Sequence, residues 1–318
     1  MRSRYDLFCQ IFDVVSVIFI TNTDTKCPYQ GITIKSDFKG KSDFKGSKWA
    51  SILRSYLKSK DFDFCYFSYD YYSEIAQTLP CLSIVEIHDV IHLRNESFKK
   101  FGYTAPSTIT KSQELSTLAE YDFVVCISQS ECKYLQNNNL QNVIYLPPFI
   151  QTKDPVKHSR NGKYGFLGGT QLPNIEGLKQ LPRSLIDDER FLIGGSISIL
   201  REVQDLIKSP ESNLGLLQNS SDFYEKVNLL LSPIKFGSGL KIKLLEALSF
   251  GLPILCTQHS IEGYPPGIED IVTVHDEPEA WTLSIIDDVL NSDPVHILEY
   301  CKENFGYDRL REQIMQTF

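Results

Sequence analysis

The sequence predicts an α/β protein with two domains, each a parallel sheet that helices cover on both faces. The length of 318 residues exceeds the usual size of one hydrophobic core. Short apolar runs alternate with segments long enough for helices over residues 62–146, and the alternation resumes over 164–274. Between them, Pro147-Pro148 and a polar, turn-rich stretch over 151–162 break the pattern. We therefore expect one domain over residues 1–150 and a second over 151–297.

Each expected strand is a short apolar run rich in β-branched or aromatic residues. A helix comes first, because Tyr5, Phe8 and Phe12 recur at helical spacing. The strands expected in the first domain are residues 14–20, 62–66, 82–87, 123–127 and 143–146. Those expected in the second domain are 164–167, 191–194, 229–232, 252–256 and 271–274. Strands that alternate with helices in this way imply a doubly wound sheet in each domain.

The charge distribution argues against nucleic acid as a partner. Residues 1–148 carry 16 basic and 16 acidic groups, and the remainder carries 16 and 24, so the net charge of -8 belongs to the second part. The composition, 42% apolar and 23% charged, is typical of a globular protein. The eight cysteines are scattered without a C-x-x-C pair, so we expect no structural zinc.

The apolar runs are too short to cross a membrane. The longest, residues 14–20, falls well below the roughly 20 residues that span a bilayer, and the N-terminus lacks the features of a signal peptide. We therefore expect a cytoplasmic protein. Between Lys35 and Lys60, eight basic residues accompany two acids, which favours either peripheral contact with the inner membrane face or a solvated loop and helix face. Within this cluster, residues 35–40 are repeated as 41–46, which we interpret as a duplicated loop.

The segment from Ser232 to Pro253 carries the strongest local signal for a ligand site. A glycine-flanked loop follows the expected strand, and a helix is expected from Leu240 to a terminating glycine at position 251. A helix N-terminus after small residues offers unpaired N–H groups and a positive dipole end to a phosphate. Lys243 and Glu246 lie on nearly the opposite face from the leucines. They fit either a ligand site or an exposed i,i+3 pair.

This segment resembles the donor-site signature of the glycosyltransferase group 1 superfamily, a family of retaining enzymes with the GT-B fold. Further segments are similar to the family, in the same order along the chain. They are residues 86–90, 114–131, 164–178, 193–195, 214–215 and 261–264. The resemblance implies two Rossmann-like domains facing a cleft, with C-terminal helices over 298–318 that cross back to the first domain. It implies transfer of a sugar, with retention, from a nucleotide sugar to a glycan or lipid-linked acceptor.

The resemblance also implies roles for particular residues. The implied donor-binding residues are Gly168, Gly169, Gly237, Ser238, Gly239, Lys241, Lys243 and Glu246. The glycine loop, with one or both lysines, holds the diphosphate of a UDP- or GDP-sugar, and Glu246 holds the ribose. No cofactor and no metal are implied, since the helix dipole and a lysine can serve the diphosphate and no Asp-x-Asp motif is present.

Several residues keep two interpretations. His88 and Glu246 are the two candidate catalytic residues. His88 follows an expected strand, so it either contacts the sugar or the acceptor hydroxyl, or caps the end of the strand. Gly168 and Gly169 lie either near phosphate or in a structural turn. His92 is a further candidate for the cleft, and Glu262 either pairs with a nearby N–H or is exposed.

Two departures from the family pattern leave a second function open. Many members carry two glutamates eight positions apart, and the first of these positions is Ser238 here. The chain also begins at the helix that follows the family's first strand, so we expect the first domain to lack that strand. These departures favour a catalytically weak, nucleotide-sugar-binding subunit that supports a partner transferase. Nucleotide-sugar epimerisation is a third, weaker alternative.

Overall fold

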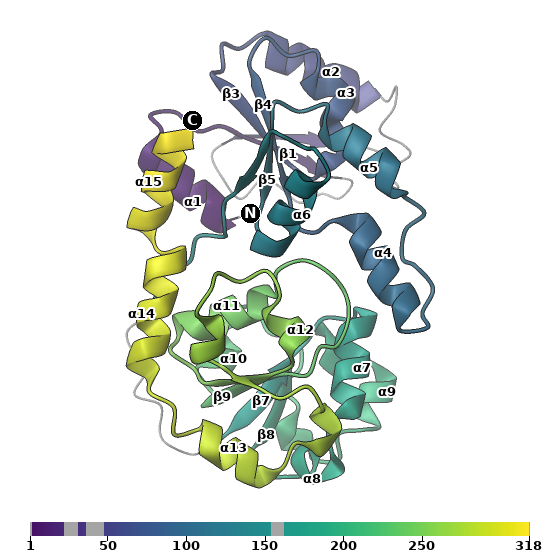
Figure 1. Ribbon diagram of the computed structural model, residues 1–318, viewed down its shortest axis with the longest axis vertical. Helices are drawn as coiled ribbons and strands as arrows, with labels where there is room; N and C mark the ends of the chain where they lie inside the picture. The colour runs from purple at the N-terminus through teal and green to yellow at the C-terminus, as the bar shows by residue number, and fades with distance from the viewer. Residues whose placement is uncertain (1, 22–30, 36–47, 154–161, 318) are drawn as a thin grey trace. The chain divides into compact units, whose positions relative to one another are not determined.

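The computed structural model describes residues 2–21, 31–35, 48–153 and 162–317, and it divides into two compact units (Figure 1). The first unit contains residues 1–92 and 107–148, and the second contains residues 93–106 and 149–318. The sequence does not indicate the assignment of residues 93–106 to the second unit. The duplicated segment over 35–46 lies outside the described residues apart from its first residue, as does most of the polar stretch over 151–162.

The first unit contains a four-stranded parallel sheet and a separate parallel pair of strands. The sheet has the order β3-β4-β5-β6, formed by β3 (Phe64–Ser68), β4 (Leu82–Ile87), β5 (Phe123–Cys126) and β6 (Val143–Tyr145). The pair is β1 (Val17–Thr21) and β2 (Gly31–Lys35). All five strands expected here are confirmed to within a few residues, whereas β2 was not predicted. Ile84 and Val124 are fully buried at the centre of the sheet.

The helices of the first unit follow the expected alternation with strands. They are α1 (Arg2–Ile11), α2 (Lys48–Lys58), the 3-10 helix η2 (Asp70–Tyr72), α3 (Ser73–Ala76), α5 (Lys111–Leu118) and α6 (Gln129–Asn137). Helix α4 (Ile91–Lys100) begins in the first unit, and most of its length is assigned to the second. The boundaries of α5 and α6 are set by N-capping side chains, Thr110 and Ser128.

The second unit is built on a five-stranded parallel sheet with the order β11-β10-β9-β7-β8. Its strands are β7 (Tyr164–Leu167), β8 (Phe191–Gly194), β9 (Leu229–Ser232), β10 (Ile254–Cys256) and β11 (Thr273–Val274), and all five were predicted. Every residue of β7 to β10 is buried, as expected for a parallel sheet covered on both faces. The core includes Tyr164, Phe191 and Trp281.

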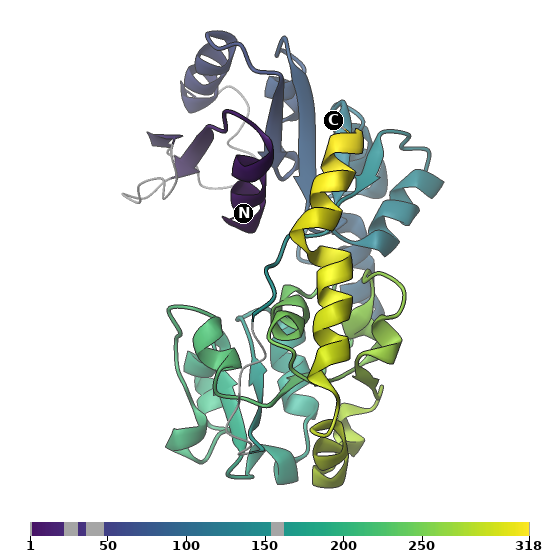
Figure 2. The same cartoon turned by 90° about the vertical axis from the view of Figure 1, so that its left-hand side faces the viewer.

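Helices connect these strands and close the chain. The α-helices are α7 (Leu172–Gln180), α8 (Arg183–Ile186), α9 (Arg201–Gln204), α10 (Ser221–Tyr224), α11 (Ile242–Ser249), α12 (Gln258–Ile261), α13 (Leu283–Val289), α14 (Pro294–Phe305) and α15 (Tyr307–Thr317). Figure 2 shows α14 and α15 following one another end to end. That they cross back to the first domain stays a prediction. No helix in the described part of the chain is long and apolar enough to cross a membrane.

The strand order of the second unit defines where a ligand site is expected. The chain runs from β7 to β8 on one side and then returns to β9 on the other side of β7, so the order reverses between β7 and β9. In open α/β sheets, ligands bind outside the carboxyl ends of the strands at such a switch point. The loops that leave this point are residues 168–171 after β7 and residues 233–241 after β9.

Candidate functional site

The loop after β9 is held in a defined conformation by glycines and by aromatic packing. Gly237 and Gly239 have φ values of 121° and 71°, which L side chains rarely adopt. The N–H of Gly237 donates a hydrogen bond of 2.9 Å to the Ser97 hydroxyl of α4. The preceding Phe236 stacks on Tyr103 with a centroid separation of 5.0 Å. The expected glycine loop therefore depends on residues 93–106, which the sequence did not connect with it.

Lys241 secures this loop. Its Nζ donates to the carbonyl of Gly239 at 2.9 Å and lies 3.5 Å from the carbonyl of Ser238. Its own carbonyl accepts a hydrogen bond of 2.9 Å from the Tyr264 hydroxyl. The Lys241 side chain thus curls back over the loop that precedes α11. Of the two lysines left open by the sequence, Lys241 has the clearer structural role.

Lys243 lies on the first turn of α11, between the two loops of the switch point. Its Nζ is 3.4 Å from the side-chain oxygen of Asn174 at the start of α7. Burial lowers the pKa of Lys243 to about 8, although the charge of Glu246 opposes this shift. The exposed ion pair between Lys243 and Glu246 that the spacing allowed is wrong, because both side chains are partly buried and no such ion pair is found among the described residues.

Glu246 is oriented by a tyrosine from α10. The Tyr224 hydroxyl lies 2.9 Å from Oε2 of Glu246 and 3.0 Å from the carbonyl of Lys243, one turn earlier in α11. Burial and the neighbouring carboxylate raise the pKa of Tyr224 well above its ordinary value, so the hydroxyl stays a donor. The Tyr224 hydroxyl therefore holds one carboxylate oxygen of Glu246, and the second oxygen has no hydrogen-bond partner among the described residues.

The loop after β7 begins with two glycines, Gly168 and Gly169. A Cβ on Gly168 would lie 2.6 Å from a ring carbon of Phe166 and 2.7 Å from a methyl group of Ile197. The backbone of Gly168 is bonded on both sides, since its N–H donates to Gly194 and its carbonyl accepts from Ile197. Gly168 thus forms a structural turn. Gly169 is partly buried, and its N–H has no partner among the described residues, so it can donate to a ligand.

Glu262 pairs with a histidine that the sequence analysis did not single out. Its carboxylate lies 2.9 Å from Nδ1 of His259 in α12. The hydrogen bond from His259, with smaller contributions from Lys241 and Lys100, lowers the pKa of Glu262. Glu262 is therefore paired through a side chain rather than through a backbone N–H, although it keeps substantial exposure.

His88 follows β4 directly and belongs to the first unit. Its Nε2 lies 3.3 Å from Glu86 Oε1, and its Nδ1 lies 3.4 Å from the Tyr69 hydroxyl. Glu86 is buried and accepts a hydrogen bond of 2.8 Å from Arg4. Burial would raise the pKa of Glu86, but the charge of Arg4 and the hydrogen bonds from His88 and Tyr66 hold it well below its usual range. The buried Glu86 carboxylate thus contacts the partly exposed imidazole of His88. The catalytic role of His88 stays a prediction.

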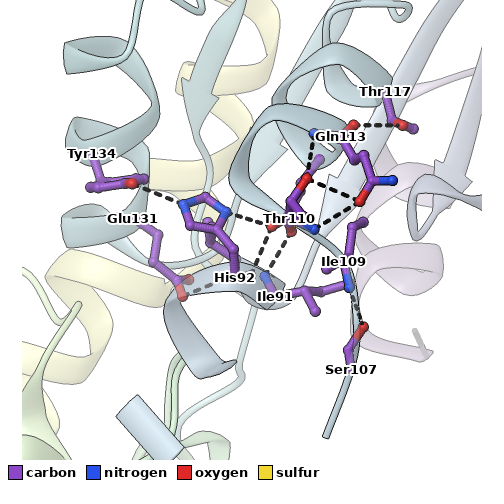
Figure 3. A network of polar contacts seen from close by, with 11 residues as sticks. Ile91, His92, Ser107, Ile109, Thr110, Gln113, Thr117, Glu131 and Tyr134 are labelled. Atoms are coloured by element: carbon purple, nitrogen blue, oxygen red, sulfur yellow. Dashed lines mark hydrogen bonds and ion pairs between the residues drawn. The ribbon is translucent and has the colours of Figure 1, made fainter. Parts of the chain in front are cut away.

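His92, a further candidate from the sequence, is buried and hydrogen-bonded within the first unit. Figure 3 shows its ring held between two elements, with Nε2 at 2.8 Å from the Tyr134 hydroxyl. Nδ1 lies 2.6 Å from Glu114, whose carboxylate also accepts from the backbone N–H groups of Ile91 and His92. Glu131 accepts from the N–H of Val90 at 3.1 Å. The two buried carboxylates thus cap the start of α4, which explains why a histidine is buried there.

The structure is similar to solved structures of known glycosyltransferases. TarM from S. aureus matches with a TM-score of 0.66 and 13% identity over 85% of this chain and 58% of TarM. A glycosyltransferase from Rickettsia africae matches with a TM-score of 0.64 and 14% identity, covering 94% of this chain and 88% of that protein. HepE from Anabaena matches with a TM-score of 0.62 and 10% identity, covering 91% and 85%.

The chain has the GT-B fold. This confirms the predicted α/β class with two Rossmann-like domains. No protein-family profile and no curated protein sequence matches the chain. At identities of 10% to 14% the likeness extends to the fold, and the chain spans little more than half of TarM.

Proposed function

We propose that this GT-B chain is a glycosyltransferase that binds a nucleoside-diphosphate sugar at the β7–β9 switch point. The observation that carries the proposal is the position of Lys243, whose pKa is lowered to about 8, one turn before a carboxylate that the Tyr224 hydroxyl contacts. Lys243 has no ion-pair partner among the described residues, so a bound anion would stabilise its charged form. Structures of HepE in complex with UDP and with UDP-glucose, and of a TarM variant in complex with UDP, support a nucleotide of this kind.

Each part of the site has a proposed role. The Gly169 N–H and the backbone N–H groups at the start of α11 donate to the diphosphate, and Lys243 neutralises its charge. Glu246 accepts hydrogen bonds from the ribose hydroxyls. Lys241 acts indirectly, because it holds the glycine loop in place.

The proposed reaction places most of the chemistry on the substrates. In a retaining transfer the bond between the anomeric carbon and the diphosphate oxygen breaks, the acceptor oxygen bonds to the same face, and the leaving diphosphate takes the acceptor proton. The protein positions both substrates and stabilises the charge that grows on the diphosphate, for which Lys243 and the α11 N-terminus are suited. His88 contacts the transferred sugar or the acceptor hydroxyl. The acceptor is a glycan, either free or lipid-linked, and a lipid-linked acceptor requires peripheral membrane contact.

A catalytically weak subunit that binds a nucleotide sugar is the second candidate. It is favoured by Ser238, which stands where many members of the resembling superfamily have a glutamate, and whose side chain cannot supply a carboxylate to the donor sugar. The two candidates share the nucleotide site and differ in turnover.

Release of nucleoside diphosphate from UDP- and GDP-sugars tests the proposal and separates the candidates. We expect turnover by the full chain, loss of turnover in Glu246→Ala, and unchanged turnover in Glu269→Ala, which removes an exposed carboxylate of the same unit. Normal turnover by Glu246→Ala would show that the donor site is wrongly assigned. Nucleotide binding without turnover, and co-purification with an active transferase, would favour the supporting subunit.

A further inference from the structure

Three aromatic rings form a cluster on the first unit. Tyr69 stacks on Tyr71 with a centroid separation of 5.6 Å and an interplanar angle of 17°, and it lies 4.6 Å from the His88 ring. Tyr69 is 39% exposed, so part of its ring is accessible to a ligand. We refer to Tyr69, Tyr71 and His88 as the Tyr69 platform.

The platform lies where ligands gather in parallel sheets. Tyr69 follows β3 and His88 follows β4, two neighbouring parallel strands in which Ser68 pairs with Glu86. The N–H of Tyr69 continues this pairing with a hydrogen bond of 2.9 Å to the Glu86 carbonyl. The rings therefore stand together at the carboxyl edge of the sheet, the edge at which α/β proteins bind their substrates.

The backbone at Tyr69 has a strained conformation. Its φ of 75° and ψ of 157° lie in a region that is essentially confined to glycine. Strain of this kind persists where the surroundings enforce it, and it clusters at ligand sites. A glycine here would relieve the strain but would remove the ring.

Residues behind the platform hold it rigid. The N–H of Tyr72 donates to the Tyr121 hydroxyl at 3.1 Å, and the Tyr72 ring stacks on Phe67, so η2 is anchored to the interior. The Glu86 carboxylate contacts Nε2 of the His88 ring, and Arg4 forms an ion pair with Glu86. The platform is thus preorganised, and binding to it requires little ordering of side chains.

We propose that the Tyr69 platform binds a pyranose ring of the acceptor glycan. A pyranose has an apolar face of C–H groups and a rim of hydroxyls, which matches an exposed aromatic face bordered by polar atoms. The Tyr69 hydroxyl and the His88 ring supply those atoms here. The inference rests on the proposed function, in which the acceptor is a glycan and the nucleotide is bound by the second unit. A nucleobase would also stack on an aromatic ring, so the test includes one.

Saturation-transfer NMR on the full chain tests the proposal with simple probes. The probes are the methyl α- and β-pyranosides of glucose, galactose and N-acetylglucosamine, with uridine as the nucleobase probe. We expect at least one glycoside to bind, Tyr69→Gly to weaken that binding by about fivefold or more, and Tyr69→Phe to keep most of it. Tyr307→Ala, which removes a tyrosine ring from the second unit, should leave glycoside binding unchanged.

Tyr69→Gly also resolves the question of folding. Because glycine suits the backbone conformation of position 69, this variant should unfold at the same temperature as the wild type or higher. Absence of glycoside binding by the wild type, equal binding by Tyr69→Gly, or loss of uridine binding in Tyr69→Gly would each overturn the platform. Parallel titration with UDP keeps the two proposals apart. UDP binding without glycoside binding rejects the platform alone, and glycoside binding without nucleotide binding rejects the donor site alone.

Discussion

Binding of a nucleotide sugar should be coupled to proton uptake by Lys243. Burial lowers the pKa of this lysine to about 8, so about half of the molecules carry a neutral Lys243 at pH 8. A bound diphosphate favours the charged form and raises that pKa. We therefore expect about 0.5 proton to be taken up per nucleotide sugar bound at pH 8, and the affinity to fall about fivefold between pH 8 and pH 9.

Calorimetry in two buffers with different ionisation enthalpies measures this uptake directly. At pH 8 the observed binding enthalpy should differ between the buffers in proportion to the protons taken up, and at pH 6 the difference should nearly vanish because Lys243 is already charged. The matched control is Lys243→Arg, which keeps the charge but does not titrate in this range. Equal enthalpies in the two buffers at pH 8 for the wild type, or the same difference in Lys243→Arg, would refute the assigned role of Lys243.

Three further predictions concern the same unit. Lys243→Met should stabilise the free protein at pH 7, by at most about 3 kcal/mol, because a pKa of about 8 in the folded state lies below the ordinary 10.5. Between pH 8 and 10.5 the unfolded state binds more protons than the folded state, so the stability gained by Lys243→Met should fade as the pH rises through this range. Urea unfolding of the wild type and the variant at several pH values measures this change. Tyr224→Phe removes the donor that fixes Glu246 and should weaken nucleotide binding by about threefold to tenfold in titration calorimetry, with little change in unfolding temperature. Gly168→Ala should destabilise the chain by about 1–3 kcal/mol in urea unfolding, since the added methyl group would contact Ile197 at 2.7 Å; a smaller loss would show that the turn can adjust.

The strands were predictable because their pattern is local. Strands β4, β7, β8 and β9 have the expected bounds, since each is a short apolar run between turn residues. Strand β2 was missed, because Gly31–Lys35 ends in lysine and has too few apolar residues to stand out. The pattern within a segment decides whether a strand forms, but it does not show which distant segment will pair with it.

The proposed donor site was only partly predictable for the same reason. The loop and helix that carry Lys243 and Glu246 could be recognised from glycines and leucine spacing. Which of Lys241 and Lys243 binds the diphosphate could not be predicted from the sequence, because it depends on how the Lys241 side chain folds back onto Gly239. The contribution of Tyr224 was also hidden, since 22 residues separate it from its partner and no periodicity joins them.

The assignment of residues 93–106 to the second unit shows the limit most clearly. Phe98, Phe101 and Tyr103 lie far from Phe236 in the sequence, yet all three rings pack around it. The sequence analysis did not connect these three rings with the loop after β9. Their aromatic packing stabilises the loop after β9.

Calorimetric titration of the full chain with UDP, GDP and their sugar conjugates tests the central claim most directly. We predict that one of these nucleotides binds, that Glu246→Ala weakens its binding by about tenfold or more, equivalent to about 1.4 kcal/mol, and that Glu269→Ala leaves it unchanged. Absence of binding to all of them by a folded chain, or equal binding by the two variants, would contradict a donor site at the β7–β9 switch point.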